Sequence, residues 1–148
     1  MSKKILVIAY FSVIILSFIS CKKKEETSSP SFTWTYKGIT YNALYVEANT
    51  AYYFGKPTII GDLRTARPSR GSGQQITLSS FNTGSYTFTS GSNINYFDFI
   101  EPNGGAQVAV NGTLQLTKSD NKLSGTFSVS LNNGFPVTGS FSNLIIDQ

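Results

Sequence analysis

Residues 108–141, VAVNGTLQLTKSDNKLSGTFSVSLNNGFPVTGSF, decide the fold. Apolar and polar residues alternate through three successive runs, which is typical of strands with one buried face. The sequences Ser119-Asp120-Asn121 and Asn132-Asn133-Gly134 separate these runs and favour tight turns. The stretch therefore predicts a meander of three antiparallel strands.

The alternation also predicts which residues of the meander face the core. On its first strand these are Val108, Val110, Gly112, Leu114 and Leu116. Near the C-terminus Ile145 keeps the alternation set by Phe141, whereas Leu144 and Ile146 do not. We therefore expect the last strand to kink near Asn143.

A short motif, consisting of a glycine, a hydroxyl residue and an apolar residue, recurs in these runs and in an earlier one. It occurs as Gly84-Ser85-Tyr86, Gly112-Thr113-Leu114, Gly125-Thr126-Phe127 and Gly139-Ser140-Phe141. A glycine inside a strand lets a neighbouring aromatic ring cover the backbone, or lets the strand bend. We expect one of these two roles for each of the four glycines.

Working outward, the rest of the domain repeats the pattern of short strands and turns. Phe32, Trp34 and Tyr36 share one face, Lys37-Gly38 follows as a turn, and the alternation resumes to Tyr45. Further strands are expected within 51–54, 58–63, 76–78, 86–88 and 94–100, with a bulge near Phe81 and a polar loop over 64–75. Residues 32–148 thus predict one all-β domain, an antiparallel β-sandwich or flattened barrel of about eight or nine strands.

The N-terminus resembles a bacterial lipoprotein signal. Lys3 and Lys4 precede an apolar run over 5–19, which is too short to span a bilayer as a helix. Ser20 then precedes Cys21, the only cysteine. The resemblance implies cleavage of residues 1–20 and lipidation of Cys21, followed by a polar tether over 21–31. An ordinary secretory signal and an uncleaved signal anchor are the alternatives.

Two further resemblances concern location. Lys24-Glu25-Glu26 is similar to the surface-export signal of Bacteroidota lipoproteins, which implies an outer-membrane protein facing outward, with the periplasmic face as the alternative. The segments FTWTYKGITY, GTLQLTKSDNKLSGTFSVS and VTGSFSNL resemble a group of Bacteroidota outer-membrane lipoproteins of the DUF6252-like kind. No activity is assigned to that group, so the resemblance implies a fold and a location alone.

Charge and composition exclude several classes of function. The formal net charge of +4 comes mainly from the signal and the tether, because the domain holds seven basic and six acidic residues. A domain charge of +1 argues against a nucleic-acid partner. The domain also has neither histidine nor cysteine, which excludes Ser-His-Asp and Cys-His catalytic sites and the usual zinc sites.

Carboxylates are the remaining candidates for chemistry. Glu47, Asp62, Asp98 and Glu101 include no pair whose spacing favours the acid and nucleophile of a glycosidase. Asp98, Glu101 and Asn103 offer oxygen ligands for calcium, but in no recognised motif. We therefore predict no enzymatic activity, no metal and no cofactor.

Two groups of residues are candidates for binding. The arginines Arg64, Arg67 and Arg70 occupy one polar loop that would suit acidic sugars or phosphates, or would simply be solvated. The aromatic residues are Tyr52, Tyr53, Tyr96, Phe97 and Phe99. Adjacent residues of a strand face opposite ways, so some of these rings would point outward to stack on sugars or contact a protein, unless the structure covers both faces.

These observations predict a lipid-anchored, non-catalytic envelope lipoprotein that acts as a binding or accessory module for a glycan or an envelope protein. A structural or assembly component of the outer membrane is one alternative. A lipocalin-like carrier of an apolar molecule is another.

Overall fold

The computed structural model describes residues 28–65 and 74–147, and the predicted all-β class is confirmed. Ten strands follow one another along the chain. They are β1 (Ser31–Tyr36), β2 (Ile39–Asn42), β3 (Tyr45–Tyr53), β4 (Lys56–Asp62), β5 (Gln74–Thr77), β6 (Gly84–Thr89), β7 (Tyr96–Ile100), β8 (Ala106–Ser119), β9 (Lys122–Leu131) and β10 (Pro136–Asp147).

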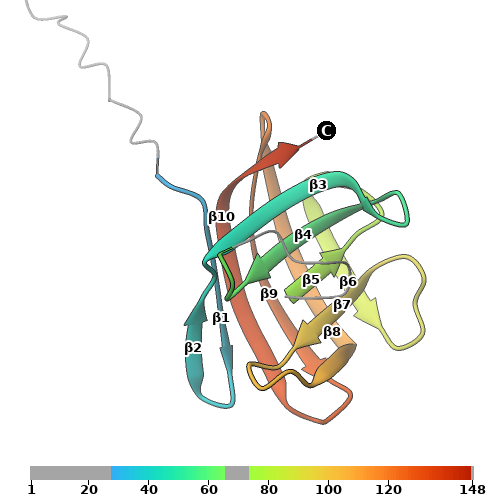
Figure 1. The fold of residues 1–148 in the computed structure, drawn as a ribbon. Coiled ribbons are helices and arrows are strands. Elements are labelled where there is room, and N and C mark those ends of the chain that lie inside the picture. Colours follow the sequence, from blue (N-terminus) through green and yellow to red (C-terminus); the bar gives the residue numbers. More distant parts are fainter. Residues whose placement is uncertain (1–27, 66–73, 148) are drawn as a thin grey trace, which may run out of the picture.

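The strands form two sheets that face each other (Figure 1). One sheet has the order β2-β1-β10-β9-β8-β6 and the other has the order β3-β4-β5-β7, with antiparallel neighbours throughout. Two long strands join the sheets, because the end of β10 pairs in parallel with β3 and the start of β8 pairs with β7. Seven strands therefore close into a barrel, to which β1, β2 and β6 are added.

Each joining strand changes its neighbour at an irregularity. In β10 the register with β9 shifts between Phe141 and Leu144, and Asn143 has a φ of 54°. The predicted kink near Asn143 is therefore confirmed. In β8 the register with β9 shifts between Ala109 and Asn111. Such bulges bend a strand and increase its twist, which is how small sandwiches turn corners.

The bulge in β8 corrects the predicted core face of this strand. Leu114 and Leu116 are buried as expected, but Val108 is 48% exposed and the buried residue before the bulge is Ala109. One inserted residue moves every earlier side chain of the strand to the other face. The prediction that Val108 and Val110 face the core with Leu114 was therefore wrong.

The chain also crosses between the sheets earlier than the alternation suggested. The predicted hairpin is formed by β1 and β2, but Tyr45 begins β3 in the second sheet. The backbone N–H of Ala43 donates to the Phe32 carbonyl, and that of Leu44 donates to the Asp62 carbonyl, each at 2.8 Å. Phe81 lies in the connection from β5 to β6, where it is buried, and not in a bulged strand.

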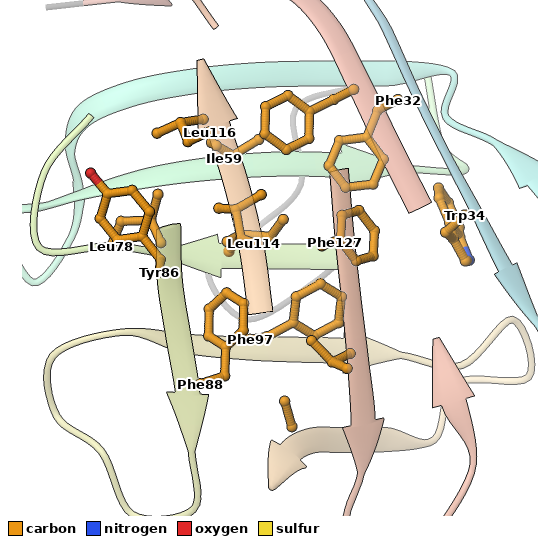
Figure 2. Packing of buried hydrophobic residues seen from close by; sticks show 14 of the residues in the cluster. Phe32, Trp34, Ile59, Leu78, Tyr86, Phe88, Phe97, Leu114, Leu116 and Phe127 are labelled. Carbon is orange, nitrogen blue, oxygen red and sulfur yellow. The ribbon is translucent and has the colours of Figure 1, made fainter. Parts of the chain in front are cut away.

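Aromatic side chains from both sheets fill the space between them (Figure 2). Phe32 lies at the centre, with ring centroids 5.9 Å from Trp34, 5.7 Å from Phe127 and 5.8 Å from Phe141. Phe97 of the opposite sheet lies 5.3 Å from Phe127. Burying each such side chain stabilises the fold by about 1.5–3 kcal/mol, so the aromatic cluster is a main source of the stability of this domain.

Two glycines of the recurring motif are covered by aromatic rings, as expected, and the arrangement is reciprocal. Gly125 of β9 is the register partner of Phe141 in β10, and Gly139 of β10 is the partner of Phe127 in β9. A Cβ atom at Gly125 would lie 2.7 Å from the Cζ of Phe141 and 2.7 Å from the Gln115 carbonyl oxygen. Each ring therefore occupies the space that a side chain on the opposite glycine would take. Gly84 is different, because no atom lies within 4 Å of its Cβ position.

Substituting Gly125 with valine tests this packing. We expect Gly125→Val to destabilise the domain by about 1–3 kcal/mol, because the added atoms must displace the Phe141 ring or the β8 backbone. Thermal unfolding followed by the fluorescence of Trp34, the only tryptophan, measures the change. Gly84→Val is the matched control, since it changes the glycine of the same motif at a position where the added side chain meets open space. Equal melting temperatures for the two variants would contradict the packing account.

Candidate functional site

A groove of about 500 Å³ lies at the corner where β8 exchanges β7 for β6 as its neighbour. Its walls come from the turn between β3 and β4, the loop between β6 and β7, and the strands β7 and β8. Ligand sites of proteins usually have volumes of about 300–1,000 Å³, so this groove suits a small ligand or part of a larger one.

Strand β7 divides its side chains between the core and the groove. Phe97 and Phe99 are 1% and 0% exposed and belong to the core, whereas Tyr96 and Asp98 alternate with them and line the groove. Val108 is the register partner of Asp98 on β8, and it reaches the groove because of the bulge that follows it. The groove thus has an aromatic residue, a carboxyl group and an apolar wall side by side.

Lys56 fixes the loop that forms the opposite wall. Its ammonium group donates a hydrogen bond to the Asn93 carbonyl and lies 5.9 Å from the centroid of the Tyr96 ring. Within this loop the Ser92 hydroxyl accepts a hydrogen bond from the backbone N–H of Ile94 at 3.2 Å. The loop is tied to the next segment by Asn95, whose Oδ1 accepts from the Ser79 N–H at 2.9 Å. The wall is therefore preorganised by contacts within the protein.

Phe54 stands at the edge of the groove in an unusual conformation. It is 72% exposed, and its φ of 51° is one that bulky residues rarely adopt. Together with Gly55 it forms a tight hairpin turn, where asparagine or aspartate would normally precede the glycine. Lys37 and Gly38 have similar positive φ values in the β1–β2 turn, so the turn itself requires this conformation, and Phe54 differs by placing a large exposed ring there.

Asp98 is the charged group of the groove that lacks a partner. Its side chain is half-buried, and it makes no ion pair or hydrogen bond with any residue in the described part of the chain. Burial raises the pKa of this carboxyl group above its ordinary value. Perturbed acids in clefts are candidates for functional residues.

The centre of the same sheet is covered on its outer face. Ile60 is fully buried but does not belong to the core cluster, and its outward neighbours Thr58 and Gln75 are also buried. The Nε2 of Gln75 has no hydrogen-bond partner within residues 28–65 and 74–147. Asp98 is the register partner of Gln75, so the groove borders this covered region.

The predicted aromatic binding residues do not form one surface. Tyr96 lines the groove, but the prediction of Phe97 and Phe99 as binding residues was wrong, because both pack in the core. Tyr52 is half-buried in β3 and does not line the groove. The side chain of Tyr53 lies outside what the structure describes.

One ion pair changes the interpretation of the predicted arginine loop. Arg64 binds the carboxylate of Asp62 in two places, with Nε 3.0 Å from Oδ1 and Nη2 2.6 Å from Oδ2. Burial alone would raise the pKa of Asp62, but the hydrogen bonds and charge of Arg64 lower it overall. Arg64 therefore stabilises the end of β4 and is not available as a free anion ligand. Arg67 and Arg70 lie outside the described residues.

The other candidate acids already have hydrogen-bond or ion-pair partners within the protein. Glu47 accepts from the Tyr45 hydroxyl at 2.6 Å, and Glu101 accepts from Gln107 at 2.9 Å and pairs with Lys37 at 3.6 Å. Within the described residues no three acidic, histidine or cysteine side chains gather as a metal site. Four predicted residues lie outside the described part of the chain: Cys21, Lys24, Glu25 and Glu26. Within the described part, no helix is long and apolar enough to cross a membrane.

Comparisons of the chain with protein-family models, with curated proteins and with solved structures find no match. The functional argument therefore rests on the groove itself. Sequence reasoning missed Phe54, Lys56 and Val108 as its lining residues, and the only available signal was the aromatic residue before Gly55, where a turn prefers a small polar one.

The raised pKa of Asp98 predicts a measurable pH effect. A carboxyl group with a raised pKa in the folded state stabilises the fold below its unfolded-state pKa, and this contribution is lost as the pH rises through the folded-state pKa. We expect Asp98→Asn to raise the melting temperature at about pH 7, and the difference from the wild type to disappear near about pH 3.5. An equal difference at both pH values would contradict the assignment to ionisation.

Proposed function

We propose that this protein is a non-catalytic envelope lipoprotein, anchored by lipid at Cys21, whose β domain binds glycans in the groove. One observation carries the glycan assignment: the groove is lined by Tyr96, by the exposed ring of Phe54 and by the carboxyl group of Asp98, which has no partner among the described residues. The proposed location is the outer membrane with the domain facing outward, and the periplasmic face is the alternative.

The chemistry of sugars supports this assignment. A pyranose ring has an apolar face of C–H groups, which packs on aromatic rings, and a rim of hydroxyl groups, which needs hydrogen-bond acceptors and donors. The groove supplies Tyr96 and Val108 as apolar surfaces. Asp98, Thr89 and Ser92 supply polar groups around them. This mixture is better suited to a sugar than to an entirely apolar molecule.

The position of the groove agrees with tethering at the N-terminus. In Figure 1 the chain reaches β1 on the left of the view, whereas the β3–β4 turn and the β6–β7 loop lie on the right. In this view the groove therefore lies across the domain from the end at which the proposed anchor would be attached. Such an orientation suits the capture of ligands from outside.

The filled interior argues against a carrier function. A lipocalin-like carrier needs an apolar cavity inside its barrel. Here the space between the sheets is occupied by packed side chains such as Phe32, Phe97 and Leu114 (Figure 2). The groove at the β8 corner lies outside this packed interior.

A structural or assembly role remains the second candidate because of one edge of the first sheet. Strand β2 is paired only with β1, carries no charged residue and exposes 57% of Ile39. Uncharged sheet edges can accept a strand from another chain. This edge would suit a protein partner, whereas the groove suits a glycan.

The anchor is tested by removing the acceptor of the lipid. We expect Cys21→Ala to move the protein from the membrane fraction into the soluble fraction, because attached acyl chains supply about 0.8 kcal/mol for each CH₂ group buried in the bilayer. Fractionation of cells, with the protein detected through a C-terminal tag, measures the change. Retention of the variant in the membrane fraction would contradict lipidation at Cys21.

The groove is tested by truncating its aromatic residue. We expect Tyr96→Ala, in the full-length protein, to lower binding to a glycan array by at least tenfold, since stacking of an aromatic ring contributes about 1 kcal/mol or more in addition to the buried area. Phe135→Ala is the control, because Phe135 is an exposed aromatic residue at the β9–β10 turn, outside the groove. A similar loss in both variants would argue for a general effect on folding.

A further inference from the structure

We propose that Asp98 determines the specificity of the groove and restricts it to neutral glycans, by accepting hydrogen bonds from two adjacent hydroxyl groups of one sugar. This inference rests on the proposed function and extends it from glycans in general to one class of them. Three observations carry it: Asp98 has no side-chain partner among the described residues, it lies two residues from Tyr96 on β7, and the ammonium group of Lys56 is engaged by the Asn93 carbonyl.

Comparison with the other buried or half-buried acids of the described residues shows that Asp98 is exceptional. Asp62 is held by Arg64, Glu47 by the Tyr45 hydroxyl, and Glu101 by Gln107 and Lys37. The protein thus satisfies each of these carboxylates with its own donors. Asp98 is half-buried as well, yet no donor in the described part of the chain reaches it. An ionised carboxylate has about four acceptor sites, so Asp98 can accept a pair of ligand hydroxyl groups.

The direction of the pKa change supports the same distinction. In Asp62 and Glu101 the effect of burial is outweighed by donors and positive charge, and the pKa is lowered. In Asp98 burial acts without compensation, and the pKa is raised. A buried polar group that lacks a partner is unfavourable for the free protein and requires an explanation. Hydrogen bonds from a bound sugar would compensate Asp98.

The geometry of β7 places this acceptor beside the stacking surface. Tyr96 and Asp98 are two residues apart on one strand, so they project from the same face at a separation of about 7 Å along it. Val108 faces Asp98 across the β7–β8 register and forms an apolar wall. A sugar ring that packs on Tyr96 therefore extends its hydroxyl edge towards Asp98.

The charges of the groove select against acidic sugars. The carboxylate of a uronic acid would lie close to the carboxylate of Asp98, and like charges in a partly desolvated site repel each other strongly. Lys56 is the cation that lines the groove, but its ammonium group donates to the Asn93 carbonyl and holds the loop. Lys56 is therefore a positioning residue for the wall, and Asp98 sets the charge that a ligand meets.

Matched glycans test this inference directly. The full-length protein is titrated, in detergent, with oligosaccharides of mannose, glucose and galactose and with the corresponding uronates, in which the C6 hydroxymethyl group is oxidised to a carboxylate. We expect the neutral member of at least one pair to bind ten times or more tightly than its acidic counterpart. In Asp98→Asn, which keeps the shape of the side chain and removes its charge, we expect this preference to fall to about threefold or less.

Two further variants separate specificity from folding. Asp98→Ala should lower binding of the neutral sugar by at least tenfold, because both hydrogen bonds are lost. Asp120→Asn makes the same change of charge in the β8–β9 turn, outside the groove, and should leave both the affinity and the preference unchanged.

The outcomes distinguish this inference from the proposed function. Equal binding of a matched pair, or tighter binding of the uronate, would overturn the role of Asp98 and leave glycan binding intact. A preference that persists in Asp98→Asn would overturn that role in the same way. Failure of every oligosaccharide to bind would overturn both.

Discussion

The close contact between glycines and aromatic rings is the constraint on which the structure depends. Gly61 of β4 lies directly against Phe32 of β1, and a Cβ atom there would be 2.6 Å from the ring. Between β9 and β10, aromatic rings likewise occupy the space where side chains on Gly125 and Gly139 would lie. The Gly61 contact brings the two sheets together over a large ring, whereas the Gly125 and Gly139 contacts pack rings closely onto the backbone within one sheet.

The barrel turns its corners in two bulged strands, and the groove lies at one of these corners. Strands β8 and β10 each belong to both sheets, and each bends at a bulge where its neighbour changes. At the β8 corner the strands β6 and β7 diverge, and the groove opens between them. The bulge also turns Val108 outward into that groove. The bulge therefore sets both the buried face of β8 and the position of Val108 in the groove.

The sequence alone predicted the positions of the strands better than it predicted which face of each strand is buried. Alternation correctly identified the meander of β8, β9 and β10 and the kink at Asn143, because these depend on local pattern. It could not reveal that one extra residue near Asn111 reverses the orientation of Val108. It also showed that Tyr96 and Phe97 face opposite ways without showing which faces the core, because both are large and aromatic. Site residues such as Lys56 are brought together only by the tertiary fold.

The two corners explain why the groove lies where it does. At the β10 corner Asn143 donates from its side-chain amide to the Ser28 hydroxyl, and Pro30 lines the remaining hollow of about 250 Å³. The acid there, Glu47, is already bound by Tyr45. At the β8 corner the lining comes from the strands and their turns, the hollow is twice as large, and Asp98 has no side-chain partner among the described residues. Of the two corners, the one at β10 is therefore partly filled by the segment before β1, and the one at β8 keeps the larger hollow.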